Sequence, residues 1–174
     1  MNACKTMLAR LVLLVLTVLA PAQEAGELPV IPLPQSVSAK SGFYEPAQDA
    51  AIVIAKDDEA LRAHAEVLSE SIRRLWGIAM PVRAGGRPGA GDIALSLERY
   101  KGPVGSYKLS IARSVTIEGG DINAIANGSA TLLQLMGAAT DKRLKSMLIK
   151  DAPDAPFRSF MVDLGRNPHS LQSL

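Results

Sequence analysis

A stripe of apolar side chains at helical spacing most restricts the folds open to this chain. Successive members lie 4, 3, 4 and 3 residues apart, which places them on one face of a helix. Acidic residues at positions 57–59 suit the beginning of that helix, and Gly77 suits its end. A helix with one apolar face has to bury that face against another element. The stripe consists of Leu61, Ala65, Leu68, Ile72 and Leu75.

Short apolar segments on both sides of this helix are typical of β-strands. Residues 106–111 alternate between apolar and polar, and after a turn at 112–114 residues 115–118 are expected to pair back as a hairpin. Asp121 is a suitable N-cap for a second helix over residues 121–137. The other strand candidates are residues 42–44, 50–54, 78–82, 93–97 and 147–149. The buried side of the second helix is predicted to comprise Ile125, Gly128, Leu132, Leu135 and Met136.

The order of these segments indicates the fold class. Two strands, a helix, further strands, a second helix and a last strand are typical of an α/β domain, in which helices cover a mixed sheet in two layers. Residues 28–37 contain three prolines and predict an extended segment at an edge or on the surface. Residues 85–91 are rich in glycine, but Pro88 and the lack of a Gly-Lys-Ser/Thr ending favour a surface loop over a phosphate site.

The first 22 residues have the form of a secretion signal. Lys5 and Arg10 precede an apolar run at 11–20, and Ala20-Pro21-Ala22 supplies a cleavage pattern of small residues. The run is about half of the roughly 20 residues that a spanning helix needs. We therefore expect cleavage, a periplasmic or secreted protein and no membrane contact afterwards, with an uncleaved N-terminal anchor as the alternative.

Charge and cysteine content narrow the function classes. The net charge of +2 comes from Lys5 and Arg10, so the mature chain is formally neutral and lacks the basic surface that nucleic acid requires. Cys4 is the only cysteine and lies within the signal, so no disulfide is expected. The two histidines, His64 and His169, have no HExxH motif around them, and no metal site is predicted.

The stretch from 154 to 169 carries the clearest functional signal. Residues 160–164 predict a buried strand bounded by Gly165 and Pro168, with Asp163 inside the strand and Arg166 just past its end. A cation at the C-terminal end of an apolar strand is how barrel enzymes present a ligand-binding residue. A buried carboxylate such as Asp163 needs a partner. The alternatives are a solvated loop arginine and a purely structural Asp163.

These residues resemble the first barrel strand of family-20 glycoside hydrolases, the β-N-acetylhexosaminidases. Asp154, Pro156, Asp163 and Arg166 match the pattern D-x-P followed by an apolar strand and D-x-x-R, and residues 31–34 match the I-P-x-P opening of the family. The resemblance covers residues 28–170 and departs where the family usually has an aromatic residue after the arginine. It implies a signal peptide at 1–22, an N-terminal α/β accessory domain at 23–152, and the beginning of a (β/α)₈ TIM barrel at 153–174.

The resemblance also implies a function. Such enzymes remove terminal N-acetylhexosamine from glycans by substrate-assisted retaining catalysis, without a cofactor, using an adjacent Asp-Glu pair. The only such pair here, Asp58-Glu59, opens the first helix, where acids complement the helix dipole, so we exclude it as catalytic. The catalytic pair is therefore expected beyond this chain, which alone is predicted to be inactive. Arg166 would bind sugar hydroxyls, Asp163 would support it, and His169 is a weaker ligand candidate.

Two other functions fit the sequence. The chain could carry the accessory domain of another glycosidase family, in which a G-F-Y-G-like turn would replace residues 163–166. It could also be a secreted carbohydrate-binding or interaction module without catalytic activity. The sequence beyond Leu174 would distinguish these functions from the first one.

Overall fold

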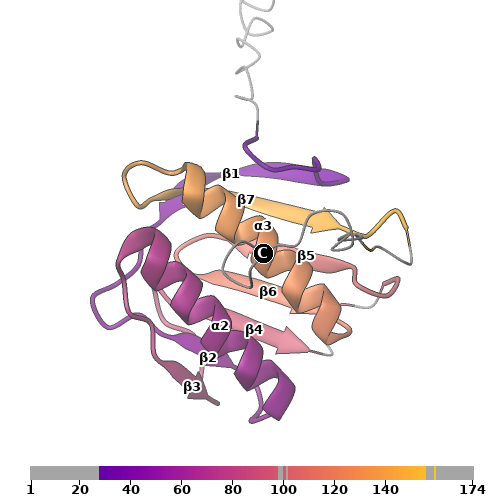
Figure 1. Ribbon diagram of the computed structural model, residues 1–174. Coiled ribbons are helices and arrows are strands. Elements are labelled where there is room, and N and C mark those ends of the chain that lie inside the picture. The colour runs from indigo at the N-terminus through magenta and orange to yellow at the C-terminus, as the bar shows by residue number, and fades with distance from the viewer. Residues whose placement is uncertain (1–27, 98–99, 101, 156–158, 160–174) are drawn as a thin grey trace, which may run out of the picture.

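Two helices cover one face of a seven-stranded sheet in the computed structural model, which describes residues 28–97, 100, 102–155 and 159 (Figure 1). The elements in chain order are β1 (Ser36–Tyr44), β2 (Ile52–Ile54), α2 (Glu59–Trp76), β3 (Val82–Ala84), β4 (Ile93–Leu97), β5 (Tyr107–Ile111), β6 (Val115–Gly119), α3 (Ile122–Ala138) and β7 (Leu144–Asp151). The core lies between the sheet and the two helices, where Leu68, Leu95 and Leu132 are at most 1% exposed.

The sheet is mixed, as predicted. Its order is β1-β7-β5-β6-β4-β2-β3, with parallel pairs β4–β6, β2–β4 and β2–β3 and antiparallel pairs on the other side of β6. The predicted hairpin is β5–β6, in register from Tyr107 opposite Gly119 to Ile111 opposite Val115. The two-layer fold class is therefore confirmed. The first and last strands of the domain, β1 and β7, are neighbours at one edge.

Helix α2 begins and ends as its sequence predicts. Asp58 is the N-cap and accepts a hydrogen bond from the backbone N–H of Leu61 at 2.9 Å, and Gly77 adopts a left-handed conformation at the C-terminus. The predicted buried stripe is wrong at its last position, because Leu75 is 48% exposed whereas Trp76 is 3% exposed. A helix of 3.6 residues per turn drifts away from a 4-3-4-3 spacing, so a step of four from Ile72 brings Trp76 to the core.

Helix α3 differs from α2 in carrying no charged residue along its length. Asp121 caps it by accepting from the N–H of Ala124 at 2.9 Å, as predicted. All five residues predicted for its buried side are buried. Gly128 allows close packing, because a Cβ atom there would lie 2.6 Å from Ile117 and 3.1 Å from the ring of Tyr107.

Several strand boundaries differ from the prediction. The strand predicted at residues 78–82 is wrong, since only Val82 belongs to β3, where it pairs in parallel with Ile52. Met80 is apolar because it is buried in the core, although it precedes the strand. The carbonyl of Pro81 accepts a hydrogen bond from the N–H of Ile52 just before β3 begins. Strands β1 and β7 are both longer than predicted, because they pair along their length with a bulge between Ala39 and Phe43.

Two predicted segments lie outside the described residues. They are the signal peptide at 1–22 and the barrel strand at 160–164. Within the part that the structure describes, no helix is both long and apolar enough to span a bilayer.

Candidate functional site

The predicted sugar ligand Arg166 and its support Asp163 lie outside the described residues, as does His169. The part of the structure that leads to them is the end of β7, where the chain leaves the sheet. We call this region the exit junction. It consists of Gln35, Gly105, Tyr107, Asn127, Thr131, Asp151, Ala152, Pro153 and Asp154.

Asp151, the last residue of β7, accepts hydrogen bonds from the two segments that flank β7 in the sheet. Its Oδ1 accepts from the backbone N–H of Gln35, which directly precedes β1, at 3.1 Å. Its Oδ2 accepts from the hydroxyl of Tyr107 on β5 at 3.2 Å. Because β7 lies between β1 and β5 in the sheet, the carboxylate links three adjacent segments.

Tyr107 connects this carboxylate to helix α3. The side chain is 1% exposed, and its oxygen lies 2.6 Å from Oγ1 of Thr131. A phenol has one proton, so with that proton directed to Asp151 the Thr131 hydroxyl donates to Tyr107. Burial, together with the negative charge of Asp151, raises the pKa of Tyr107 to about 12. Tyr107 is therefore a protonated donor at neutral pH.

Gln35 holds the chain just past β7. Its side-chain amide donates to the carbonyl oxygen of Ala152 at 3.1 Å and to Oδ1 of Asp154 at 3.4 Å. These contacts are exposed, so each adds little to stability by itself. Together they restrict the direction in which the backbone leaves the sheet.

The loop before β5 forms the other wall of the exit junction. Gly105 has φ +77°, a conformation that favours glycine. Its N–H donates to Oδ2 of Asp121, and its carbonyl accepts from the side-chain amide of Asn127, both at 2.9 Å. A Cβ atom at Gly105 would lie 3.0 Å from Cγ of Pro153 and 3.1 Å from the Asn127 amide. The glycine therefore allows the chain after β7 to pack closely on this loop.

A second polar cluster lies at Asp92, away from the exit junction. Asp92 is 4% exposed and accepts from the N–H groups of Ala51 and Gly89, each at 2.8 Å, and from the guanidinium of Arg83 at 2.9 Å. The Tyr44 hydroxyl donates to the Gly91 carbonyl at 2.9 Å beside it. A carboxylate with these partners ties the glycine-rich loop to the sheet, which is a structural role. Sequence analysis did not predict this role for Asp92. Its position directly before the predicted strand at 93–97 was the one signal that could have indicated a buried carboxylate.

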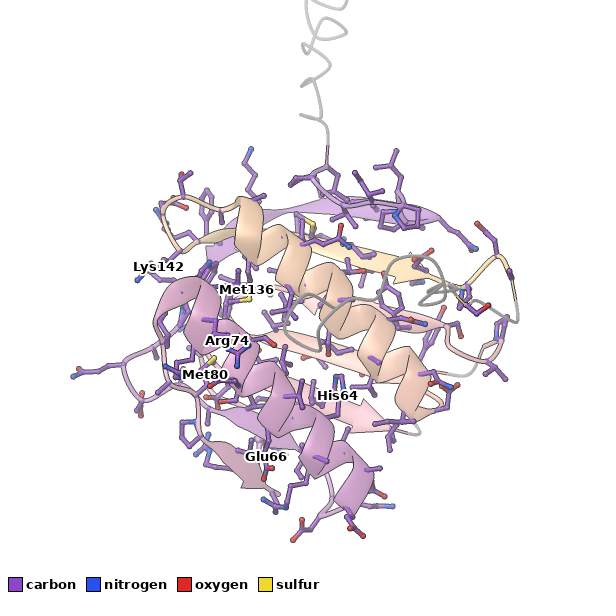
Figure 2. The ribbon with its side chains drawn as sticks, viewed as in Figure 1. His64, Glu66, Arg74, Met80, Met136 and Lys142 are labelled. Carbon is purple, nitrogen blue, oxygen red and sulfur yellow. The ribbon has the colours of Figure 1, made fainter. Side chains whose placement is uncertain are left out.

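His64 links the two helices. Its ring is half-buried and lies on the side of α2 toward α3 (Figure 2). Its Nε2 lies 3.0 Å from Oγ of Ser129, and burial lowers its pKa. Ser129 is 3% exposed and lies in the packing between the two helices, and Asn127, two residues earlier, donates to the Gly105 carbonyl in the exit junction.

An open groove runs between α2 and β3, with Arg62, Glu66 and Glu70 along its helical side (Glu66 is labelled in Figure 2). Hydrogen bonds from Arg73 and Arg74 lower the pKa of Glu70 to about 2. These ion pairs are exposed and follow helical spacing, which is the ordinary pattern of a solvated helix face. The groove is polar and open, unlike the enclosed pockets that hold substrates.

The candidate residues near the N-terminus of α2 have no catalytic arrangement. Asp58 caps the helix, as expected, and Asp57 forms an exposed ion pair with Arg62 at 2.6 Å. The described residues contain no group of three His, Cys, Asp or Glu side chains placed to hold a metal ion. Among the described residues, polar contacts at the exit junction link the end of β7 to the chain before β1, to β5 and to α3.

Comparison with known proteins identifies this domain. Residues 27–152 match the family model described as glycosyl hydrolase family 20, domain 2. None of the curated proteins searched matches the chain. Among solved structures, the β-N-acetylhexosaminidase of Streptomyces coelicolor A3(2) is 25% identical with a TM-score of 0.70, over 83% of this chain and 30% of that one.

Two further solved structures were determined with a bound sugar. The exo-β-N-acetylglucosaminidase of Vibrio harveyi, in complex with N-acetylglucosamine, is 23% identical with a TM-score of 0.67, over 83% of this chain and 22% of that one. A mutant β-hexosaminidase of Streptomyces plicatus, in complex with its product, is 27% identical with a TM-score of 0.66, over 80% and 29% of the two chains. This chain thus spans less than a third of the length of these relatives. With its match across residues 27–152, the chain belongs to glycosyl hydrolase family 20.

Proposed function

We propose that this chain is the N-terminal part of a secreted β-N-acetylhexosaminidase that removes terminal N-acetylglucosamine or N-acetylgalactosamine from glycans. The observation that carries the proposal is the family match across residues 27–152. The sugar complexes of the Vibrio harveyi and Streptomyces plicatus relatives support the substrate class. The role of the described domain in this proposal is to support the catalytic part that residues 153–174 begin.

The proposed reaction is substrate-assisted and retains the anomeric configuration. In this scheme the 2-acetamido oxygen of the substrate attacks the anomeric carbon, and a glutamic acid protonates the leaving oxygen. The neighbouring aspartate orients the acetamido group. We place that Asp-Glu pair beyond Leu174, since Asp58-Glu59 is occupied by helix capping. No cofactor is required because the nucleophile belongs to the substrate.

Arg166 is the residue of this chain that we assign to the substrate. A guanidinium presents several N–H donors in one plane and can donate to two neighbouring sugar hydroxyls. Asp163 would support Arg166 from the same strand. Both assignments rest on the resemblance of residues 154–166 to the first barrel strand of the family.

Export is the second part of the proposal. The basic residues Lys5 and Arg10, the apolar run and the Ala20-Pro21-Ala22 pattern support cleavage after Ala22. Mass spectrometry of protein recovered from the periplasm or the medium should then find an N-terminus at Gln23. Recovery of the uncleaved chain from the membrane fraction would instead indicate an N-terminal anchor.

The deciding experiment begins with the coding sequence that follows the codon for Leu174. An open frame with an adjacent Asp-Glu pair is expected, and the protein expressed with that frame should hydrolyse 4-nitrophenyl N-acetyl-β-glucosaminide. Arg166→Ala should raise KM by about ten- to a hundredfold, because hydrogen bonds to a charged group contribute about 1.5–3 kcal/mol.

Arg113→Ala is the matched control for this assay. Arg113 is exposed in the turn between β5 and β6, so its removal should leave both kcat and KM unchanged. A stop codon directly after Leu174, or activity that is equal in wild type and Arg166→Ala, would contradict the proposal. The first outcome would favour a secreted binding or interaction module.

A further inference from the structure

One face of the sheet carries no helix among the described residues, because α2 and α3 lie together on the other face (Figure 1). Successive side chains of a strand point to opposite faces. Leu109 and Ile149 belong to the core beneath the helices. Their neighbours Lys108, Ser110 and Lys150 therefore lie on the helix-free face of β5 and β7.

The same face continues to the beginning of β7 and onto β1. Tyr44 and Leu144 lie opposite each other in the ladder, and both are buried in the core. Phe43 and Lys145 also form a pair, and they point away from the core because each adjoins one of these buried residues. Phe43 is 49% exposed, although its side chain is large and apolar.

Hydroxyl groups occupy the middle of this face. Ser38 on β1 and Ser110 on β5 both lie opposite Leu148, which is the outward residue of β7 between its two lysines. We call the surface the open sheet face, and it consists of Ser38, Phe43, Lys108, Ser110, Lys145 and Lys150.

The lysines of the open sheet face are placed at a cost to stability. Lys150 lies directly opposite Lys108 across β7 and β5, and like charges in such positions repel each other. Lys108 is compensated by Glu118, whose Oε2 lies 2.8 Å from its Nζ. Within the described part of the chain, Lys145 and Lys150 have no ion-pair partner. Strand β7 therefore presents two uncompensated cations on one face.

Phe43 gives the open sheet face an aromatic surface. The guanidinium of Arg143 lies over its ring, 4.6 Å from the ring centre, and Glu45 is 3.6 Å from Nε of the same arginine. An exposed aromatic ring can pack on the apolar C–H face of a sugar, and serine hydroxyls both donate and accept hydrogen bonds. Ammonium groups complement carboxylates.

We propose that the open sheet face binds an anionic glycan. Lys145 and Lys150 pair with carboxylates along the sugar chain, Ser38 and Ser110 bond to its hydroxyls, and Phe43 packs on a sugar ring. A phosphate polymer would use the lysines alone, and a bilayer would need a larger apolar area than one phenylalanine. This inference goes beyond the proposed function, because binding here requires no catalytic residue.

Calorimetric titration of the 174-residue chain with hyaluronan oligosaccharides tests the proposal. Hyaluronan carries carboxylates at regular intervals, and N-acetylchitohexaose is its neutral counterpart. The double variant Lys145→Ala/Lys150→Ala should raise the Kd for hyaluronan about three- to tenfold, the loss expected for two exposed ion pairs. The Kd for N-acetylchitohexaose should not change in this variant. Binding of hyaluronan should also weaken as salt is added.

Arg74→Ala/Arg87→Ala is the matched control, because it removes the same charge elsewhere. Arg74 lies on α2, on the helical side of the sheet, and Arg87 lies in the loop after β3, at the edge opposite to β1. The control should bind hyaluronan as wild type does. Equal losses in the two double variants would overturn the proposal, since binding would then follow net charge alone.

Phe43→Ala distinguishes a glycan from other polyanions. It should raise the Kd for hyaluronan about two- to tenfold, because an aromatic contact is lost, and should leave the Kd for inorganic polyphosphate unchanged. An unchanged Kd for hyaluronan would rule out a sugar contact at Phe43. Binding to phosphatidylglycerol vesicles without binding to hyaluronan would replace the glycan by a membrane surface.

The stability of Lys150→Ala shows whether Lys150 is present for the fold or for a ligand. Removal of one of two facing like charges should raise the Tm while it weakens binding to hyaluronan. A lower Tm would show that Lys150 stabilises the sheet, and its assignment to a ligand would then be wrong.

Discussion

Trp76, the last residue of α2, donates its indole N–H to the carbonyl oxygen of Met136 near the end of α3 at 2.8 Å. The two helices are therefore joined near their C-terminal ends by a buried hydrogen bond. Figure 2 labels Met136 on the side of α3 toward α2. The same helices are joined farther toward their N-termini by His64 and Ser129.

Trp76→Ala should destabilise the domain much more than Leu75→Ala. Trp76 is 3% exposed and loses both its packing and its hydrogen bond, at a cost of about 3–5 kcal/mol. Leu75 is 48% exposed, and its truncation should change the free energy of unfolding by roughly 0.5 kcal/mol or less. Urea denaturation of the two variants measures the difference. Similar values would mean that the helix is rotated from the described position.

Gly128→Ala and Gly137→Ala should change stability in opposite directions. A methyl group at Gly128 would lie 2.6 Å from Ile117, and such overpacking costs about 1–3 kcal/mol. At Gly137 nothing lies within 4 Å of the added Cβ, so alanine should stabilise α3 by about 0.5–1 kcal/mol through helix propensity. Thermal unfolding would show a lower and a higher Tm respectively. A higher Tm for both variants would disprove close packing at Gly128.

Asp92→Ala should cost about 1–3 kcal/mol, because it removes the acceptor of two backbone N–H groups, whereas its other partner, Arg83, is exposed and can be solvated. Asp57→Ala is its control, since Asp57 also pairs with an arginine but is exposed, and exposed pairs contribute at most about 1 kcal/mol. Chemical denaturation compares the two variants. A cost below 1 kcal/mol for Asp92→Ala would show that the loop at 85–91 does not depend on this carboxylate.

The free energy of unfolding should fall as pH drops below about 6.5, the ordinary pKa of histidine. Burial lowers the pKa of His64 in the folded state, so the unfolded state takes up the proton at higher pH. The stabilising effect of neutral His64 is therefore complete above the unfolded pKa and is lost as pH falls toward the folded one. His64→Gln should flatten this part of the stability–pH curve. Parallel curves for wild type and His64→Gln would contradict the expectation.

Local patterns in the sequence predicted much of the fold. The caps at Asp58 and Asp121, the end of α2 at Gly77 and the β5–β6 hairpin all depend on residues close in the chain. The predicted buried stripe of α2 was wrong only at Leu75. The 4-3-4-3 spacing averages 3.5 residues per turn and the helix has 3.6, so by the last turn Trp76 rather than Leu75 faces the core. Strand β3 was misplaced because its position is set by pairing with β2, across the whole of α2.

The contacts of the exit junction could not be predicted from the sequence. Gln35 and Asp151 are 116 positions apart, and neither lies in a pattern that marks the other as a partner. Tyr107 was expected only as a strand residue, and its hydroxyl acquires a role through Thr131 and Asp151. Arg166 and Asp163 stay predictions, since they rest on spacing within a stretch outside the described residues.

The neighbouring position of β1 and β7 has a mechanical consequence. The strands are antiparallel, and Ser36 at the start of one lies opposite Lys150 near the end of the other. Tension applied between the chain before β1 and the chain after β7 therefore pulls on the same end of one ladder. The hydrogen bonds would break one pair after another, as in a zipper, rather than share the load. The Gln35–Asp151 contact lies at that end and would be among the first to bear the force.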